Sequence, residues 1–373
     1  MLGLHRDIPT GYLDGARGIA VLIVWLSHSS GRDQALAPWL SFHGIGHVGV
    51  MLFFVLSGYL LARPLARGGA FDYGPYLLRR FLRIAPLYWL VLVGVAVYQL
   101  TIGVSSTRYL FLSDGFRGLV EHLVFIKGDG VFWTIATEFV FYLILPPLAL
   151  ALVRYRSRGL WTLLAVSFLY GAYHMLVTVN RLELPALKLV DTRQHSQFLD
   201  VFAIGVACGF LSVDAAARRF YALHRKRLDA LALAAFLTTL LCTCILVSKR
   251  FLWFEQPFYH FRYASFGYAL VFGLTLLSAQ LGNARLRSLL DWKPFRFCGV
   301  VGYSWYLLHL PVLAAVNQLA LAPPMKFALS TAAVAVISCA GYLLIEEPFI
   351  RLGKRIAASP RAAEMPAASR SGA

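Results

Sequence analysis

The chain has 373 residues, of which 59% are hydrophobic and only 14% are charged. A soluble domain carries about 25% charged residues, so water-soluble cores and disorder are both excluded. The composition predicts an all-α integral membrane protein. A formal net charge of +17 suggests nucleic acid in a soluble protein, but cationic cytoplasmic loops explain it in a membrane protein. We therefore expect the lipid bilayer, and no nucleic acid, as a partner.

About ten segments are long and apolar enough to form a bundle of transmembrane helices. In chain order they are residues 12–30, 46–63, 84–102, 131–153, 160–177, 197–212, 228–247, 264–281, 299–320 and 326–345. The stretch 109–126 is interrupted by charged residues and is interpreted as an outer loop with room for a short helix.

The distribution of Lys and Arg between the loops predicts the orientation of the bundle. Lys and Arg concentrate in the loops that lie on the same side of the membrane as the N-terminus. The positive-inside rule therefore places both termini in the cytoplasm. We expect one transmembrane domain over residues 1–352. Residues 353–373 are expected to form a cytoplasmic tail, and their small and polar composition favours disorder.

Ionisable residues inside the apolar segments are candidate functional positions, because each costs roughly 3 kcal/mol to insert. Arg17 and His28 in the first segment are eleven residues apart. They therefore share one helix face and lie about 16 Å apart along its axis. That face should look into a protein cavity. The structural alternative is an interfacial ion pair between Asp14 and Arg17, with a histidine that only packs against a neighbouring helix.

Two further arginines, Arg80 and Arg83, precede the third segment on the predicted cytoplasmic side. Their three-residue spacing puts both on one face of a helix. Paired guanidinium groups suit a polyphosphate or a nucleotide phosphate, because each makes bidentate contacts. From charge alone, a positive-inside anchor or a contact with anionic lipid is the favoured alternative.

The fourth segment carries Glu138 about 10 Å in from its outer end. Thr134 and Tyr142 stack with it on one face at four-residue spacing. His28 is expected in the same outer half of the membrane, which permits a shared site; a protonated glutamate bonded to another helix is the alternative. His309, just before a kink-prone proline, is either a site residue or a packing histidine bonded to a carbonyl that the proline leaves free.

Several short motifs follow one another in a fixed order over residues 10–352. They are Asp14-Gly-x-Arg17-Gly with His28, Gly49-Val-Met-Leu-Phe-Phe-Val-Leu-Ser57-Gly58-Tyr59, Arg80-x-x-Arg83-Ile-x-Pro86, Trp133-Thr-x-x-x-Glu138-Phe-x-x-Tyr142, Ser304-x-Tyr306-Leu-Leu-His309-x-Pro311 and Glu347-Pro348. In this ordered set the chain resembles the integral-membrane acyltransferase type 3 family, which acylates sugars and other hydroxyl-bearing molecules. The chain departs from the family at Met51, where an Asp is usual. This change should remove a polar contact near the second segment without touching the proposed catalytic residues.

The resemblance implies an O-acyltransferase of the bacterial cytoplasmic (inner) membrane. Acyl-CoA is the expected donor, with acetyl as the default group, and a hydroxyl of a carbohydrate, glycolipid or small molecule is the acceptor. His28 is the expected general base, or the nucleophile of a covalent variant, and Glu138 should orient it. Arg80 and Arg83 should hold the coenzyme A phosphates, with Arg17 lining the channel or balancing Asp14.

The remaining expectations concern the oxyanion, cofactors and alternative functions. Trp133, Tyr142 or a backbone N–H is expected to stabilise the oxyanion. Five cysteines, an odd number placed mostly in apolar runs, favour neither a disulfide nor a metal site. No tightly bound cofactor is expected, and no oligomeric state is indicated. A transporter or flippase for a glycolipid or small solute would also place such polar groups in a bundle, whereas a non-catalytic scaffold would not need them.

Overall fold

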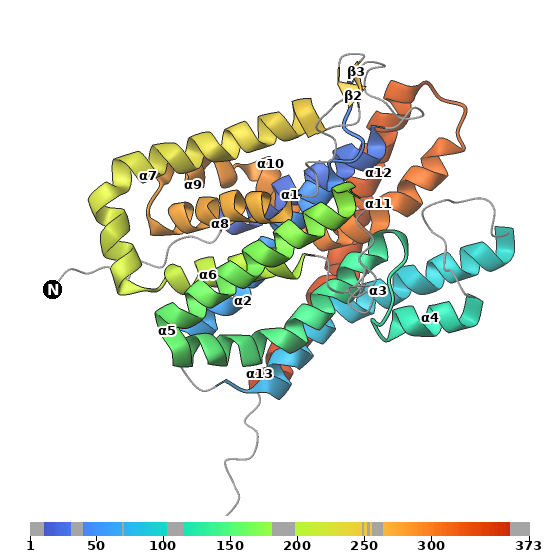
Figure 1. Cartoon of the computed structure of the whole chain (residues 1–373). Helices are drawn as coiled ribbons and strands as arrows, with labels where there is room; N and C mark the ends of the chain where they lie inside the picture. Colours follow the sequence, from blue (N-terminus) through green and yellow to red (C-terminus); the bar gives the residue numbers. More distant parts are fainter. Residues whose placement is uncertain are drawn as a thin grey trace, which may run out of the picture.

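The computed structural model describes residues 11–30, 40–68, 71–102, 115–180, 198–247, 250–251, 254–255 and 264–358. Most of these residues are helical (Figure 1). The α-helices are α1 (Gly11–Ser29), α2 (Gly46–Ala66), α3 (Tyr73–Ile102), α4 (Gly115–Leu123), α5 (Trp133–Asn180), α6 (Leu199–Leu211), α7 (Ala215–Cys242), α8 (Ser265–Leu281), α9 (Ala284–Leu290), α10 (Lys293–Val300), α11 (Gly302–Asn317), α12 (Pro323–Gly341) and α13 (Glu347–Ala358).

Shorter elements join or extend these helices. A 3-10 turn, Gly130–Phe132, leads into α5, and π-helical turns continue α7 over Thr243–Val247 and α12 over Tyr342–Glu346. Three two-residue strands, β1 (Leu40–Ser41), β2 (Arg250–Phe251) and β3 (Phe254–Glu255), form a small antiparallel sheet in that order. The prediction of an all-α membrane protein is confirmed at this level.

Five helical stretches among the described residues are long and apolar enough to cross a membrane, or seven if each of two bent helix pairs is one span. The bent pairs are α8 with α9, at 109°, and α10 with α11, at 76°. Two of the predicted crossings fall on helices outside this group: α1, which carries Asp14 and Arg17, and α6, which has only 13 residues. Ten crossings and cytoplasmic termini therefore stay predictions.

Two predicted crossings, 131–153 and 160–177, lie on the single long helix α5. The expected loop between them is a sharp bend at Arg156, whose backbone angles of φ 46° and ψ −122° are not helical. Figure 1 shows the result as two green arms that meet at an angle. A bend of this kind needs no extra loop, because one residue absorbs the change of direction.

The first helix packs backbone to backbone against the α9–α10 region through small residues. A Cβ added at Gly15 would overlap the carbonyl oxygen of Leu290, and one added at Gly18 would overlap the carbonyl oxygen of Phe295. From the other side, a Cβ at Gly299 would overlap the carbonyl oxygen of Asp14. Membrane helices approach this closely only where side chains are absent. These glycine contacts therefore fix the place of α1 in the bundle, and with it the place of the polar residues that α1 carries.

A second close crossing joins α2 to α6. A Cβ at Gly58 would overlap the carbonyl oxygen of Phe202, and one at Gly205 would overlap that of Val55. The apolar window of α2 is 61% buried, whereas that of α7 is only 11% buried. Thus α1 and α2 form the interior of the bundle, and α7 lies on its outside, where it can face lipid.

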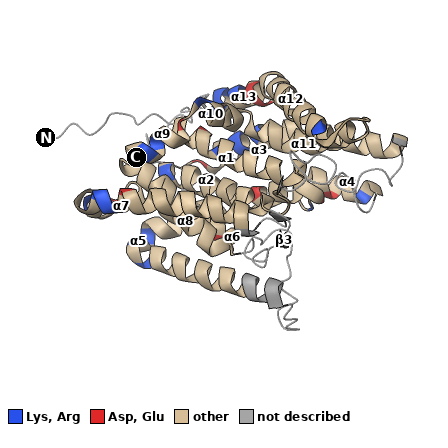
Figure 2. Ribbon diagram, turned by 90° about the horizontal axis from the view of Figure 1, so that it is seen from above, with Lys and Arg blue, Asp and Glu red and all other residues tan. Residues whose placement is uncertain are grey.

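Charged residues are distributed unevenly over the two ends of the bundle. Figure 2 shows most Lys and Arg near α7, α9, α10 and α13, while fewer lie at the end marked by α4. The positive-inside rule predicts such an asymmetry between a cytoplasmic and an outer side. The predicted outer loop 109–126 contains α4, the short helix for which the sequence left room. One boundary differs from the sequence interpretation: α13 continues to Ala358, beyond the expected start of the tail at residue 353.

Candidate active site

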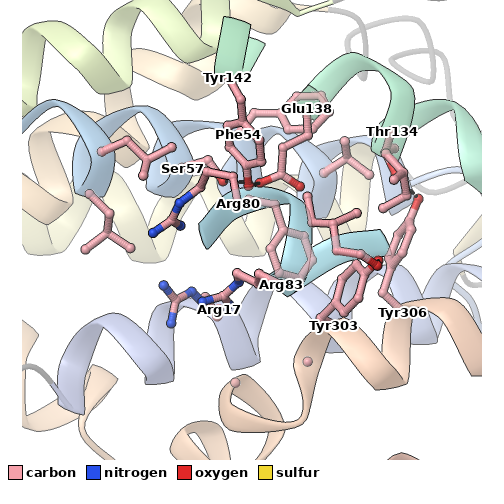
Figure 3. Close-up of a pocket in the computed structure, with 18 residues that line it drawn as sticks. Arg17, Phe54, Ser57, Arg80, Arg83, Thr134, Glu138, Tyr142, Tyr303 and Tyr306 are labelled. Atoms are coloured by element: carbon pink, nitrogen blue, oxygen red, sulfur yellow. Dashed lines mark hydrogen bonds between the residues drawn. The ribbon is translucent and has the colours of Figure 1, made fainter. Parts of the chain in front are cut away.

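Two adjoining cavities lie between α1, α2, α3, α5 and α11. We call the larger, of about 330 Å³, the arginine cavity; its polar lining is Arg17, Ser57, Arg80, Arg83, Thr134, Glu138, Tyr142, Tyr303 and Tyr306 (Figure 3). We call the smaller, of about 270 Å³, the histidine cavity; its polar and aromatic lining is Ser27, His28, His43, His47, Trp133 and Tyr306. Val50 and Tyr306 line both. The first helix passes from one cavity to the other, with Arg17 in its second turn and His28 in its last turn.

Helix α3 supplies the paired arginines. It begins at Tyr73, well before the predicted segment, so Arg80 and Arg83 lie on the helix and both face the arginine cavity. In the described part of the chain neither forms an ion pair with a carboxylate, although Arg80 lies over the ring of Tyr142 at 6.0 Å. The Nε atom of Arg80 is buried without a hydrogen-bond partner. A guanidinium pair in this condition is open to an anionic ligand.

The third arginine is already paired. Arg17 donates from Nη1 to Oδ1 of Asp14 at 2.7 Å, one turn earlier on α1. The two side chains are about one-quarter and one-third exposed, and Arg17 lines the arginine cavity. The ion pair that the sequence offered as a structural alternative is therefore present, and it coexists with a position on the cavity wall.

Glu138 projects into the arginine cavity from α5. Its Oε1 accepts hydrogen bonds from the Ser57 hydroxyl at 2.9 Å and from the Tyr142 hydroxyl at 2.6 Å. The expected alignment of Thr134, Glu138 and Tyr142 on one helix face is confirmed, since all three line this cavity. Figure 3 shows the carboxylate among Ser57, Tyr142 and the arginines.

The expected pairing of Glu138 with His28 is not formed, and this corrects the sequence interpretation. The two residues line different cavities. Spacing along α5 placed the carboxylate on a polar face correctly, but it gave no information on which helix lies opposite. That helix is α2, which presents Ser57. Ser57 belongs to the Ser57-Gly58-Tyr59 motif, so its presence in a motif was the available signal for this partner.

His28 meets His309 instead. Its Nδ1 lies 2.9 Å from Nε2 of His309, the ring planes differ by 19°, and the ring centres are 5.0 Å apart. Two imidazoles that touch through these nitrogens have centres this far apart only when the rings meet edge to edge. A hydrogen bond to a lone pair in the ring plane requires this edge-to-edge contact. His28 is partly exposed to the histidine cavity, whereas His309 is 1% exposed.

The second nitrogen of His309 binds a backbone carbonyl. Its Nδ1 lies 2.6 Å from the carbonyl oxygen of Tyr306, three residues earlier. The sequence suggested a carbonyl freed by Pro311, which would be that of Leu307. The observed acceptor is the neighbouring carbonyl, so the packing alternative for His309 was right about a carbonyl partner and missed the contact with His28.

The shared wall of the two cavities is held by Tyr306. Its hydroxyl donates to the carbonyl oxygen of Val131 and accepts from the Thr134 hydroxyl, both at 2.9 Å. Trp133, beside this contact, lines only the histidine cavity and lies near His47, with ring centres 6.4 Å apart. Met51, where the sequence departs from the family pattern, is fully buried and lines neither cavity.

Over the residues that the structure describes, no group of three or more His, Cys, Asp or Glu side chains is placed to hold a metal ion.

Comparison with known proteins agrees with the motifs. A family model described as an acyltransferase domain matches residues 10–346. YrhL of Bacillus subtilis, provisionally named a peptidoglycan O-acetyltransferase, is 26% identical over 330 residues, which cover 83% of this chain and 49% of YrhL. BcsY of Komagataeibacter xylinus, provisionally named a membrane-bound transacylase, is 27% identical over 367 residues, which cover 92% of this chain and 82% of BcsY.

A third relative extends the comparison. The peptidoglycan O-acetyltransferase OatA of Listeria monocytogenes is 22% identical over 375 residues, which cover 94% of this chain and 57% of OatA. The chain thus spans about half the length of YrhL and of OatA. No solved structure matches it. Because the family model covers nearly all of the chain and the motifs occur in the family's order, the protein belongs to the acyltransferase type 3 family of membrane proteins.

Proposed function

We propose that the protein is an O-acyltransferase of the bacterial inner membrane, which moves an acyl group, by default acetyl, from acyl-CoA to a hydroxyl of a carbohydrate or glycoconjugate. One observation carries the proposal: a cationic cavity and a histidine-lined cavity adjoin at Val50 and Tyr306. In a group transfer the donor's acyl carbon must meet the acceptor's hydroxyl oxygen, and two adjoining cavities would let a charged donor and a neutral acceptor approach each other from separate sides.

The arginine cavity is the proposed donor site. Arg80 and Arg83, which lack carboxylate partners in the described chain, would bind the phosphates of acyl-CoA, and Arg17 would add charge beside them. Apolar lining from Phe53, Phe54 and other residues suits the pantetheine arm and the acyl chain. The donor would enter from the cytoplasm, because the arginines lie on the predicted cytoplasmic side.

Within this cavity Glu138 is assigned to the donor side of the reaction. Its carboxylate accepts from Ser57 and Tyr142 and lies among cationic groups. In the proposed mechanism it keeps Ser57 and Tyr142 in place on the wall of the donor cavity. It does not act on His28.

The histidine cavity is the proposed acceptor site. His28 would take the proton of the acceptor hydroxyl on Nε2 while the oxygen attacks the thioester carbonyl carbon. Collapse of the tetrahedral intermediate breaks the carbon–sulfur bond, and the proton passes from His28 to the coenzyme A sulfur. Of the two side chains expected to stabilise the oxyanion, Tyr142 donates to Glu138, whereas Trp133 lines the acceptor cavity and is the better candidate.

The acceptor class follows from the relatives. Two of them are named peptidoglycan O-acetyltransferases, so a bacterial glycan or its lipid-linked precursor is the acceptor that we propose for this chain. His28 lies at the end of α1 opposite to Arg17, which suits an acceptor that approaches from the outer side.

Membranes that contain the protein, supplied with isotope-labelled acetyl-CoA, provide the test. We expect label in a glycan or glycolipid product, identified by mass spectrometry, and we expect the His28→Ala variant to form no such product at equal protein level. In parallel, acetyl-CoA should raise the Tm of the purified protein, because a ligand that binds only the folded state stabilises it.

The same experiment separates an enzyme from a transporter. A protein that gains no thermal stability from acetyl-CoA, labels no product and moves a glycolipid or solute across vesicles would be a transporter or flippase. Wild-type transfer by His28→Ala would leave the family activity in place and remove His28 from the mechanism.

A further inference from the structure

The contact between His28 and His309 has a direction that the hydrogen bonds themselves determine. We propose that His309 is a positioning residue, which holds His28 in the tautomer whose Nε2 carries a lone pair toward the histidine cavity. The proposal rests on the proposed function, because it assigns the orientation of its general base. It concerns a chain of three groups: Tyr306 carbonyl, His309 and His28.

The chain begins at an atom that can only accept. The carbonyl oxygen of Tyr306 lies 2.6 Å from Nδ1 of His309, so Nδ1 must carry the proton. A neutral imidazole has one protonated nitrogen, and Nε2 of His309 is therefore an acceptor. It lies 2.9 Å from Nδ1 of His28, which must then donate. The same rule leaves Nε2 of His28 unprotonated.

The side chain that carries the free nitrogen lies where a base is needed. In the described part of the chain His28 makes one hydrogen bond, the one to His309, and its side chain lines the histidine cavity. Its Cε1 atom faces Gly46 of α2, where an added Cβ would lie 3.9 Å away. An acceptor hydroxyl in this cavity would thus meet a basic nitrogen and not an N–H.

The arrangement also suits the charge that forms during transfer. When Nε2 takes the acceptor proton, His28 becomes a cation that still donates from Nδ1 to His309. The carboxylate of a catalytic triad performs this task with a full negative charge, whereas His309 offers a neutral lone pair. In an apolar bundle a neutral partner avoids the cost of an unpaired buried carboxylate in the resting state.

A direct test is the protonation state of His28. We expect 15N NMR of histidine-labelled protein in nanodiscs, with His28 assigned by its loss in His28→Gln, to show a protonated Nδ1 and an unprotonated Nε2. In His309→Leu the preference should disappear, while in His309→Gln an amide oxygen near the position of Nε2 can accept from Nδ1 and retain it. A protonated Nε2 in the wild type would overturn the proposal, and so would an unchanged signal in His309→Leu.

Kinetics supply the second test, with acetyl-CoA as donor and N-acetylglucosamine oligomers as the acceptor probe. We expect His309→Leu to lower kcat by roughly 10²–10⁴-fold, the range of a general-base contribution, with the KM for acetyl-CoA unchanged. His309→Gln should recover most of this loss. Equal losses in both variants, with wild-type Tm, would overturn the positioning role. The exposed His224→Leu on α7 is the control and should behave as wild type.

The two proposals fail in distinguishable ways. If wild-type protein transfers no acyl group to any acceptor, the proposed function fails, while the NMR measurement still decides how His28 is protonated. If transfer occurs but His309→Leu keeps the wild-type kcat, the function stands and the positioning role is wrong.

Discussion

Gly18 of α1 lies so close to Phe295 of α10 that an added Cβ would overlap the Phe295 carbonyl oxygen. The glycine belongs to the Asp14-Gly-x-Arg17-Gly motif, and it directly follows Arg17, which lines the arginine cavity. The motif therefore combines a charged wall residue with the small residues that let α1 enter the bundle. The position of Arg17 on the cavity wall and the packing of α1 against α10 therefore depend on the same short motif.

Replacing Gly18 by Ala should destabilise the protein. The backbones of α1 and α10 would have to separate, and overpacking of this kind costs about 1–3 kcal/mol. We expect a lower Tm in detergent and weaker acetyl-CoA binding. Gly94→Ala on α3 is the matched control, since nothing lies within 4 Å of its Cβ position, and its Tm should stay at the wild-type value or rise slightly. Equal Tm values for the two variants would contradict this packing.

Removing both unpaired arginines should weaken donor binding specifically. Hydrogen bonds to charged groups contribute about 1.5–3 kcal/mol each, so Arg80→Gln/Arg83→Gln should raise the Kd for acetyl-CoA by at least roughly 100-fold. Acetyl-pantetheine lacks the nucleotide phosphates and should bind wild type and variant alike. Titration calorimetry in nanodiscs measures both ligands.

A neighbouring arginine controls for charge. Arg79 lies on the same helix and lines neither cavity. Arg79→Gln should therefore keep wild-type affinity for acetyl-CoA. An equal loss in Arg79→Gln would mean that net charge at this end of the bundle, and not the pair in the cavity, attracts the donor.

Glu138 and Tyr142 should be energetically coupled. Glu138→Gln and Tyr142→Phe each disrupt the 2.6 Å hydrogen bond, so their effects on the free energy of unfolding should be non-additive by about 0.5–3 kcal/mol. The control cycle pairs Tyr142→Phe with Glu121→Gln, a carboxylate on α4 that pairs with Arg117, and should be additive. Denaturant titration in mixed micelles gives these energies. Additive effects of Glu138→Gln and Tyr142→Phe would show that this hydrogen bond does not contribute to the free energy of unfolding.

Tyr306 should limit the length of the acyl group. Its ring lines both cavities, so Tyr306→Ala would join them and give a longer chain room. Each buried methylene contributes about 0.8 kcal/mol, roughly fourfold in kcat/KM, and the preference for butyryl- over acetyl-CoA should rise accordingly. Tyr306→Phe keeps the ring and should keep the wild-type preference. The ratio of the kcat/KM values for butyryl- and acetyl-CoA measures this preference. An unchanged ratio in Tyr306→Ala would show that Tyr306 does not limit the length of the acyl group.

Local periodicity predicted which residues share a face. The three-residue spacing of Arg80 and Arg83 and the four-residue spacing of Thr134, Glu138 and Tyr142 each place their members on one cavity wall. These predictions succeed because the rotation per residue in a helix is fixed by its backbone. The predicted third crossing started only at residue 84, because the preceding turns are cationic, whereas the helix that carries Arg80 and Arg83 begins at Tyr73.

Partners across helices could not be predicted in the same way. His28 meets His309 although the two are 281 positions apart, and Glu138 meets Ser57 across 81 positions. Such pairs depend on which helices are neighbours and on their crossing, and the glycine contacts that decide this are not visible as periodicity. The bend at Arg156 is a related case, because one non-helical residue replaced the expected loop between two crossings.

Under the proposed function, the shared boundary at Val50 and Tyr306 would have a consequence for the cell's permeability barrier. If only the acyl group passes this point, coenzyme A stays on the side where it is regenerated, and the glycan stays on the side where it is assembled. The protein would then export a two-carbon unit across a lipid bilayer with neither a pore for ions nor an alternating movement of the whole substrate.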